Sequence, residues 1–134
     1  MKLDLNCIRD TLITLESWLV LNDDLEFVYL DLDEIHKSSN MLKYPRAEVA
    51  YTLIVLREAD FIEAIIDYGS NRIDELDVIR LTYKGHQFLD TIRPQSVWDK
   101  IYSVSEKTNL KSISAIMEIA DILLPETIKS VLRS

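Results

Sequence analysis

The stretch from Ile79 to Asp90 is the part of this 134-residue chain that most constrains its fold. An apolar run rich in β-branched residues ends at Leu81, and Thr82 is a residue type that caps helix N-termini. Beyond Thr82, apolar residues recur at helical spacing and predict an amphipathic helix. Gly85, near the start of that helix, indicates close packing. The stretch therefore predicts a joint between a strand and a helix, with a different kind of structure on each side.

Before this joint the sequence predicts alternating helices and strands. Apolar residues at helical spacing predict a first helix over residues 4–21, with Asp4 as its N-cap. Pro45 suits the first turn of a later helix that runs to Ala59. Asp60 then tolerates the left-handed backbone with which such a helix would end. The shorter predicted elements are a strand over 25–30, a brief helix over 31–36, and strands over 61–67 and 77–81 joined by a turn at 68–71.

After the joint the pattern is helical throughout. Pro94 interrupts the helix that follows Thr82, and a second helix is predicted over residues 95–105. Ser112 caps a third helix, and Pro125 is predicted to start one last turn or two. The third helix has a broad apolar face, which must be covered on more than one side. Either the first helix of the same chain or a second copy can cover it. The second case predicts a homodimer.

The predicted element order defines a fold class. Helix, strand, helix, helix, strand, strand, helix is the order of a winged helix-turn-helix. The predicted class is thus α+β: a winged helix-turn-helix core over residues 1–92, with a C-terminal helical extension over residues 93–134 packed on it. At 134 residues the chain is long enough to bury a core.

The charge distribution restricts the partners of the chain. The net charge is −8, and residues 1–34 contain nine acidic side chains against two basic ones. This sign opposes binding to a polyphosphate unless a local basic face overcomes it. No apolar run has the length needed to span a bilayer, and no secretory leader is evident. With Cys7 as the single cysteine, these features predict a cytoplasmic protein without a membrane partner.

Catalysis and metal binding are not expected. His36 and His86 are the two histidines, and neither lies at metal-ligand spacing from another ligand or from Cys7. The chain has no glycine-rich phosphate loop and no nucleophile elbow. The acidic clusters, such as Asp31-x-Asp33, lack the glycine and terminal glutamate of a calcium loop. We predict a non-catalytic protein with no cofactor and no metal.

Several stretches resemble known families. Residues 49–62 and the segment Leu81-Thr82-Tyr83-Lys84-Gly85 are similar to the recognition helix and the wing exit of bacterial winged-helix repressors. Over nearly the whole chain, residues 1–9, 49–51, 81–90, 97–100 and 112–116 resemble domain of unknown function 2513, an uncharacterised family. That resemblance implies a small bacterial or prophage-encoded protein with a winged-helix-like fold. It implies no activity, because the family has none assigned.

The winged-helix resemblance implies a candidate DNA-binding surface on the helix after Pro45 and on the wing. Helical geometry directs Val49, Leu53 and Leu56 to the core and the opposite side of the helix outward. The candidate nucleic-acid or partner-binding residues are Lys43, Arg46, Ala50, Tyr51, Ile54, Arg57 and Arg72. Four cations are few for duplex DNA, although a dimer would double them.

Two functions are therefore predicted as alternatives. The first is a DNA-associated transcriptional regulator of phage or prophage type. The second is a protein-interaction module or an inhibitor of a host factor, binding a host or phage protein through the same helix or through the acidic N-terminal third. Packing of some of these side chains inside the fold is a third interpretation.

Overall fold

A computed structural model describes residues 3–133 of the chain. They form six α-helices and antiparallel strands, an α+β arrangement as predicted. The chain divides into two compact units after His86, within α4, whereas the predicted boundary lay after residue 92. Each unit is described by itself. Within residues 3–133, no helix combines the length and hydrophobicity that crossing a bilayer requires.

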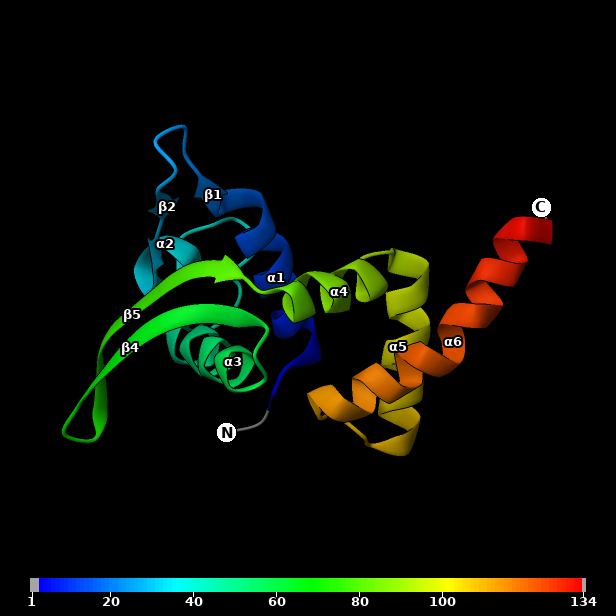
Figure 1. Ribbon diagram of the computed structural model, residues 1–134. Helices are drawn as coiled ribbons and strands as arrows, with labels where there is room; N and C mark the ends of the chain where they lie inside the picture. Colours follow the sequence, from blue (N-terminus) through cyan, green and yellow to red (C-terminus); the bar gives the residue numbers. More distant parts are fainter. Residues whose placement is uncertain (1–2, 134) are drawn as a thin grey trace. The chain divides into compact units, whose positions relative to one another are not determined.

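The N-terminal unit contains a three-stranded antiparallel sheet in the order β3-β5-β4, and a separate two-stranded ribbon of β1 and β2 (Figure 1). Helix α3 packs on the sheet and on α1. The elements are α1 (Leu5–Trp18), β1 (Val20–Leu21), β2 (Phe27–Val28), β3 (Leu30–Asp31), α2 (Leu32–His36), α3 (Arg46–Glu58), β4 (Ile62–Gly69) and β5 (Arg72–Leu81).

The helix starts in this unit follow from their capping residues. Asp4 caps α1, as predicted, and its carboxylate accepts hydrogen bonds from the backbone N–H groups of residues 6 and 7. Asp31 caps α2 and forms a reciprocal capping box with Glu34. Pro45 precedes α3, where its missing N–H costs nothing. The apolar core between these helices and the sheet includes Leu12, Leu15, Ile35, Val49, Leu53, Leu56 and Val78, all fully buried.

Residues 19–31 differ from the prediction. We expected a helix to residue 21 and one strand over 25–30, but α1 ends at Trp18 and the chain forms the β1–β2 hairpin before β3. The side chain of Asn22 accepts hydrogen bonds from the backbone of residues 24 and 26, which closes a tight turn. Leu25 has φ 62° in this turn, a conformation rare for leucine. The turn at Asn22 therefore ends the helix earlier than the spacing of its apolar residues predicted.

The β4–β5 hairpin is also longer than predicted. Its turn contains Ser70 and Asn71, and Asn71 adopts a left-handed conformation. Strand β5 begins at Arg72 rather than at Asp77, so Asp74 and Glu75, which fall between the predicted turn and the predicted strand, lie on the strand. Pairing with β4 along its whole length holds them there, although aspartate is a poor strand former.

The predicted joint at Thr82 and Gly85 is confirmed. The Thr82 hydroxyl accepts a hydrogen bond from the Gly85 N–H at 3.2 Å, and the Thr82 N–H donates to the Phe61 carbonyl at 3.0 Å. Asp60, with φ 63°, ends the segment after α3 in the left-handed conformation that we expected. A Cβ at position 85 would lie 2.0 Å from the Phe61 carbonyl oxygen, so only glycine fits without a shift of the backbone.

The C-terminal unit is helical. Helix α4 (Tyr83–Ile92) leads into it, and α5 (Gln95–Thr108) packs against α6 (Ile113–Arg133). The predicted break at Pro94 and the Ser112 cap are confirmed. Asn109, in a left-handed conformation, ends α5. The buried contact residues of α5 and α6 are Val97, Trp98, Ile101, Ile113, Ile116, Ile119 and Ala120.

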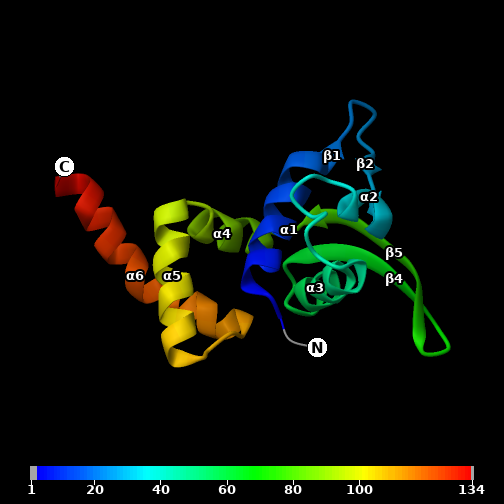
Figure 2. The same cartoon turned by 180° about the vertical axis from the view of Figure 1, so that it is seen from behind.

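Pro125 departs from the prediction. We expected it to start a separate last turn, but it lies inside α6. The helix continues past it, and its axis changes direction along its length in Figures 1 and 2. Near this point the Thr127 hydroxyl donates to the Leu123 carbonyl at 3.1 Å. The proline thus bends the helix without ending it.

Candidate functional sites on the N-terminal unit

The predicted binding residues lie on α3, just before it, and at the start of β5. Arg46 and Arg57 are exposed on α3, and Lys43 precedes the helix. Ala50 is a correction: it is only 8% exposed, because its side of the helix is covered, although helical geometry alone directed it outward. Tyr51 and Ile54 are half-buried. The outer side of α3 is therefore not an open apolar surface.

Three of the four predicted cations are held by carboxylates. Arg46 donates from Nε to Oδ1 of Asp33 at 2.7 Å and from Nη2 to Oδ2 at 3.4 Å. Arg72 Nε lies 2.7 Å from Asp74 Oδ1. Lys43 Nζ lies 3.1 Å from Asp10 Oδ2. A phosphate group at any of these cations would have to compete with a carboxylate that is already in place.

Asp10 has a second partner, since the Tyr44 hydroxyl donates to it at 2.6 Å. Burial, together with this hydrogen bond to a carboxylate, raises the pKa of Tyr44 above its usual range. Tyr44 is only 8% exposed, so the pair fixes the loop before α3 rather than offering a reactive phenol. Lys43 joins this structural cluster.

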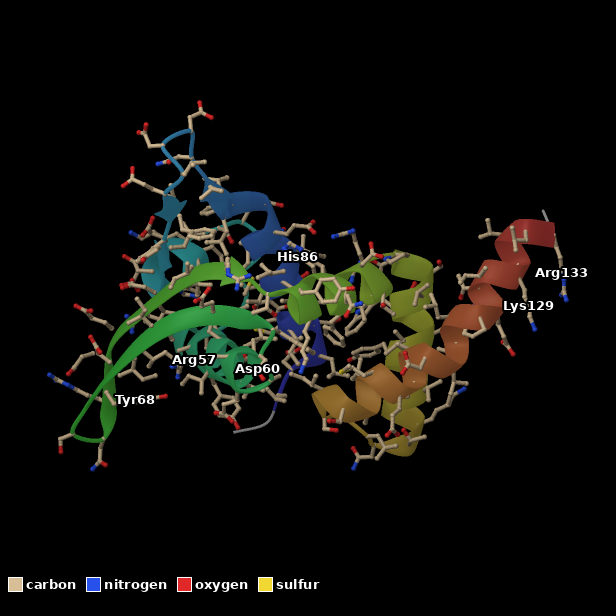
Figure 3. The ribbon with its side chains drawn as sticks, viewed as in Figure 1. Arg57, Asp60, Tyr68, His86, Lys129 and Arg133 are labelled. Atoms are coloured by element: carbon tan, nitrogen blue, oxygen red, sulfur yellow. The ribbon has the colours of Figure 1, made fainter. Side chains whose placement is uncertain are left out.

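Arg57 differs from the other cations. It is exposed on α3 (Figure 3), and within residues 3–133 no ion pair to it is found. Glu58 and Asp60 follow it closely in the chain and are also exposed, so the local charge is not positive. One unpaired guanidinium is a small phosphate-binding surface compared with the several contacts that duplex recognition uses.

A groove beside α3 is strongly acidic. A cavity of about 440 Å³ opens between the start of α2, the start of α3 and β5. Arg46 is the cation in its lining, and it is paired with Asp33. The carboxylates that line the cavity are Asp31, Asp33, Asp74, Glu75 and Asp77. The field of this groove repels phosphate and attracts cationic groups.

The ion pair of Arg46 gives a testable pKa. The Arg46 guanidinium, by hydrogen bonding, holds the pKa of Asp33 below its ordinary value of 3.8, and the pKa of Arg46 is raised in turn. In Arg46→Ala we expect the Asp33 pKa to rise toward the ordinary value, measured by NMR titration of the carboxyl carbon. Because the folded pKa is depressed, the stabilising effect of the pair is present above the ordinary pKa and is lost as the pH falls through the folded value. An unchanged Asp33 pKa in Arg46→Ala, or an equal change in the control Arg57→Ala, would contradict this pairing.

The most exposed apolar surface of the N-terminal unit is on the β1–β2 hairpin. We call it the hairpin surface. The hairpin stands out from the rest of the unit in Figures 1 and 2. Its large side chains are 42% to 78% exposed: Trp18, Val20, Leu21, Leu25, Phe27, Val28 and Tyr29. Val20 pairs with Val28 and Leu21 with Phe27, so these side chains lie on both faces of the hairpin. A concentration of exposed large apolar side chains in one segment is typical of interaction sites.

A small cavity lies at the base of the hairpin surface. It measures about 100 Å³ and is lined mainly by apolar side chains of α1, β1, β2 and the end of β5, including Leu15, Leu19 and Phe27. Its lining also contains three polar residues, Glu16, Arg80 and His86. Arg80 is paired across the sheet with Glu63 at 2.7 Å. The cavity offers an apolar recess beside an exposed apolar surface, an arrangement that suits an anchoring side chain.

The hairpin surface carries acidic charge at its edge. Asp23, Asp24 and Glu26 lie in the turn between β1 and β2, and all three are exposed. Sequence reasoning noted the acidic N-terminal third but not the hairpin, because residues 19–21 fitted the end of a helix. The usable signal was that residues 25–30 show no polar alternation, although a half-buried strand would need one.

Cys7 and His36 make contacts within the fold. Cys7 is fully buried and receives a hydrogen bond from the Thr52 hydroxyl at 3.4 Å, and burial raises the pKa of its thiol. The His36 ring nitrogen Nε2 lies 2.8 Å from the Tyr44 carbonyl oxygen. Among the residues that the structure describes, no group of three or more histidine, cysteine, aspartate or glutamate side chains is arranged to hold a metal ion.

The fold and these surfaces define a small α+β protein whose N-terminal unit exposes an apolar hairpin and an acidic groove. The chain belongs to the family described as "Hypothetical protein (DUF2513)", whose model matches residues 2–111. A protein of Haemophilus influenzae described as "Uncharacterized protein" is 35% identical over 81 residues. The match covers 58% of this chain and 66% of that protein. No solved structure is significantly similar.

Proposed function

We propose that this chain is a non-catalytic protein-interaction module that binds another protein through the hairpin surface. The single observation that carries the proposal is the run of exposed apolar side chains from Trp18 to Tyr29. Exposing them to water is unfavourable by roughly 25 cal/mol per Å² of apolar area, and a partner would remove that cost. The adjoining cavity of about 100 Å³ supplies a recess for an anchoring side chain.

The acidic charge of the N-terminal unit indicates which partner segments would bind it. The turn of the hairpin is acidic, and the groove beside α3 is acidic as well. A partner segment with an aromatic or aliphatic anchor flanked by lysine or arginine complements this surface, because opposite rim charges accelerate encounter. A host or phage protein with such a segment fits the prophage setting that the family resemblance implies.

The test compares two substitutions at exposed apolar positions. Phe27→Asp lies in the hairpin surface, and Tyr83→Asp lies outside it at a side chain that is 75% exposed. A partner recovered from lysate by the wild-type chain and by Tyr83→Asp, but not by Phe27→Asp, is the expected result. Equal recovery by all three chains would refute the role of the hairpin surface. Circular dichroism establishes that each variant is folded.

A DNA-associated regulator is the second candidate function. The order α1, β3, α2, α3, β4, β5 and the sheet order β3-β5-β4 fit a winged helix-turn-helix, and Arg57 is exposed on the helix that would enter the groove. Fold alone does not establish DNA binding. The paired cations and the acidic groove weigh against it.

Duplex binding separates the two candidates. We expect no retardation of duplex DNA at about 150 mM salt, because the groove beside α3 repels phosphate. A retardation that weakens steeply with salt and disappears in the double variant Arg46→Ala, Arg57→Ala would instead support the regulator. The matched control is Lys107→Ala, which removes a cation from α5.

A further inference from the structure

The first part of strand β5 has no strand beside it on one edge. Strand β3 pairs with β5 only at Asp77 and Val78, and the chain then turns into α2. Residues 72–76 pair with β4 on one edge, and none of the described residues adds a strand on the other. Alternate residues of a strand direct their N–H and C=O groups to each edge. We call residues 72–76 the open edge; it offers about 17 Å of backbone to another strand.

The open edge lies along the groove beside α3. That cavity of about 440 Å³ separates β5 from the starts of α2 and α3. Its lining from β5 consists of Ile73, Asp74, Glu75, Leu76 and Asp77. Arg46 also lines the cavity but is held by Asp33. The groove therefore leaves room beside the strand for the side chains of an added segment.

The register of the sheet separates apolar from acidic side chains along this part of β5. Glu75 and Asp77 lie on one face, and Leu76 lies on the other. A register shift leaves Asp74 without a partner on β4, so Ile73 falls on the same face as Leu76. Leu76 is buried and Ile73 half-buried, whereas Glu75 is exposed. An added strand would therefore meet apolar side chains on one face and carboxylates on the other.

The acidic face contains two cross-strand pairs of like charge. Asp31 lies opposite Asp77 in the pairing of β3 with β5, and Asp67 lies opposite Glu75 in the pairing of β4 with β5. Such pairs destabilise a sheet. Within residues 3–133, no ion pair to Glu75 or Asp77 is found. A lysine or arginine on an added strand would relieve this repulsion, whereas the same edge of a second copy would increase it.

We propose that the open edge binds an extended segment of another protein as an added strand, and that basic and apolar residues alternate in this segment. Main-chain hydrogen bonds to residues 72–76 hold the segment, and the alternation of its side chains selects it. Its basic side chains face Glu75 and Asp77, and its apolar side chains face Ile73 and Leu76. The site shares no residue with the hairpin surface, so it does not depend on the function proposed above.

Peptides test the strand addition directly. The probe is a blocked synthetic hexapeptide in which lysine alternates with valine, titrated into the full chain by calorimetry at about 50 mM salt. A peptide with the same lysines and valines in two separate blocks should bind at least about tenfold more weakly. Two further peptides keep the alternating order but carry N-methyl groups on every lysine or on every valine. Because an added strand directs only one of these sets toward β5, one methylated peptide should lose binding and the other should keep it.

Variants of the chain locate the binding site. Glu75→Gln combined with Asp77→Asn should weaken binding of the alternating peptide by about tenfold, because both cationic contacts are lost. The matched control, Asp23→Asn combined with Glu26→Gln, removes the same charge from the hairpin turn and should leave binding within about threefold. Phe27→Asp should leave it within the same limit, which distinguishes this site from the hairpin surface.

Amide hydrogen exchange gives an independent measure of the added strand. At saturating peptide, exchange within residues 72–76 should slow at the amides that do not already bond to β4. No saturable binding at about 1 mM peptide, or equal binding of the alternating and block peptides, would overturn the proposal. So would unchanged exchange within residues 72–76 or equal effects of the two N-methylated peptides. Loss of peptide binding in Phe27→Asp would also overturn it, by placing the peptide on the hairpin surface.

Discussion

Replacing Gly85 with alanine should destabilise the N-terminal unit by about 2 kcal/mol or more. At an ordinary helical position the same change would stabilise a protein by up to about 1 kcal/mol, because alanine favours the helix. Here the added Cβ would lie 2.0 Å from the Phe61 carbonyl oxygen and 2.9 Å from the carbonyl carbon. These are backbone atoms, so a rotamer change cannot remove the overlap.

The overlap also disturbs the hydrogen bonds of the joint. The Phe61 carbonyl accepts from the Thr82 N–H, and the Thr82 hydroxyl accepts from the Gly85 N–H. If α4 moves away from Phe61, one of these bonds lengthens, and each contributes about 1 kcal/mol. Urea unfolding followed by circular dichroism at 222 nm measures the change in midpoint.

Gly69→Ala is the matched control, since it alters the other glycine of the chain. A Cβ there would meet Asp74 Oδ2 at 2.6 Å, but this atom ends a side chain that can rotate. We expect a change of less than about 1 kcal/mol. An unfolding midpoint for Gly85→Ala equal to or above that of the wild type would show that the close approach of α4 to Phe61 is wrong.

Truncating Phe27 to alanine should weaken binding of the purified partner by about 30-fold or more. Aromatic side chains that anchor an interface typically contribute about 2 kcal/mol or more when removed, mostly by faster dissociation. Phe27 is 47% exposed and also lines the cavity at the base of the hairpin, so it combines an open face with a recess. Surface plasmon resonance on the full chain gives both rate constants.

The acidic turn should act on the association rate instead. Neutralising it with Asp23→Asn, Asp24→Asn and Glu26→Gln should slow association several-fold at low salt and flatten its salt dependence, because rim charges steer encounter. The dissociation rate should change little. The control Glu106→Gln removes a carboxylate from α5. If Phe27→Ala leaves the dissociation rate unchanged while the partner stays bound, the anchor lies elsewhere.

Local signals predicted the parts of the fold that depend on neighbouring residues. Asp4 and Ser112 cap helices, Asp60 adopts the left-handed conformation, and Thr82 and Gly85 form the joint after β5. Each depends on interactions within a few residues or on a close approach for which glycine is the usual signal. The α+β class also followed from the order of the elements.

The errors arose where a tight turn, a proline that the helix tolerates, or packing against another element overrides the local pattern. The turn at Asn22 and the pairing of β1 with β2 override the helical pattern up to residue 21. Pro125 stays inside α6 because the helix has apolar contacts before it, which a single-sequence rule for proline does not include. Ala50 is buried although helical geometry directed it outward.

The candidate site depends on contacts between residues that are far apart in the sequence. The cations of the α3 region were identified from the sequence, but their carboxylate partners were not. Asp33 reaches Arg46 from α2, and Asp10 reaches Lys43 from α1. No spacing rule links such pairs, because they depend on how the helices pack. The acidic groove likewise combines residues of three separate elements.

The most direct test of the proposed hairpin interaction compares photo-cross-linking from two positions in living cells. A photoreactive residue at position 25 lies in the hairpin surface, where Leu25 is 78% exposed, and one at position 57 lies on the exposed side of α3. We expect one protein adduct of defined mass from position 25, absent when Phe27→Asp is added, and none from position 57. Adducts from position 57 to protein or DNA, with none from position 25, would contradict the proposed interaction and favour α3 as the binding element.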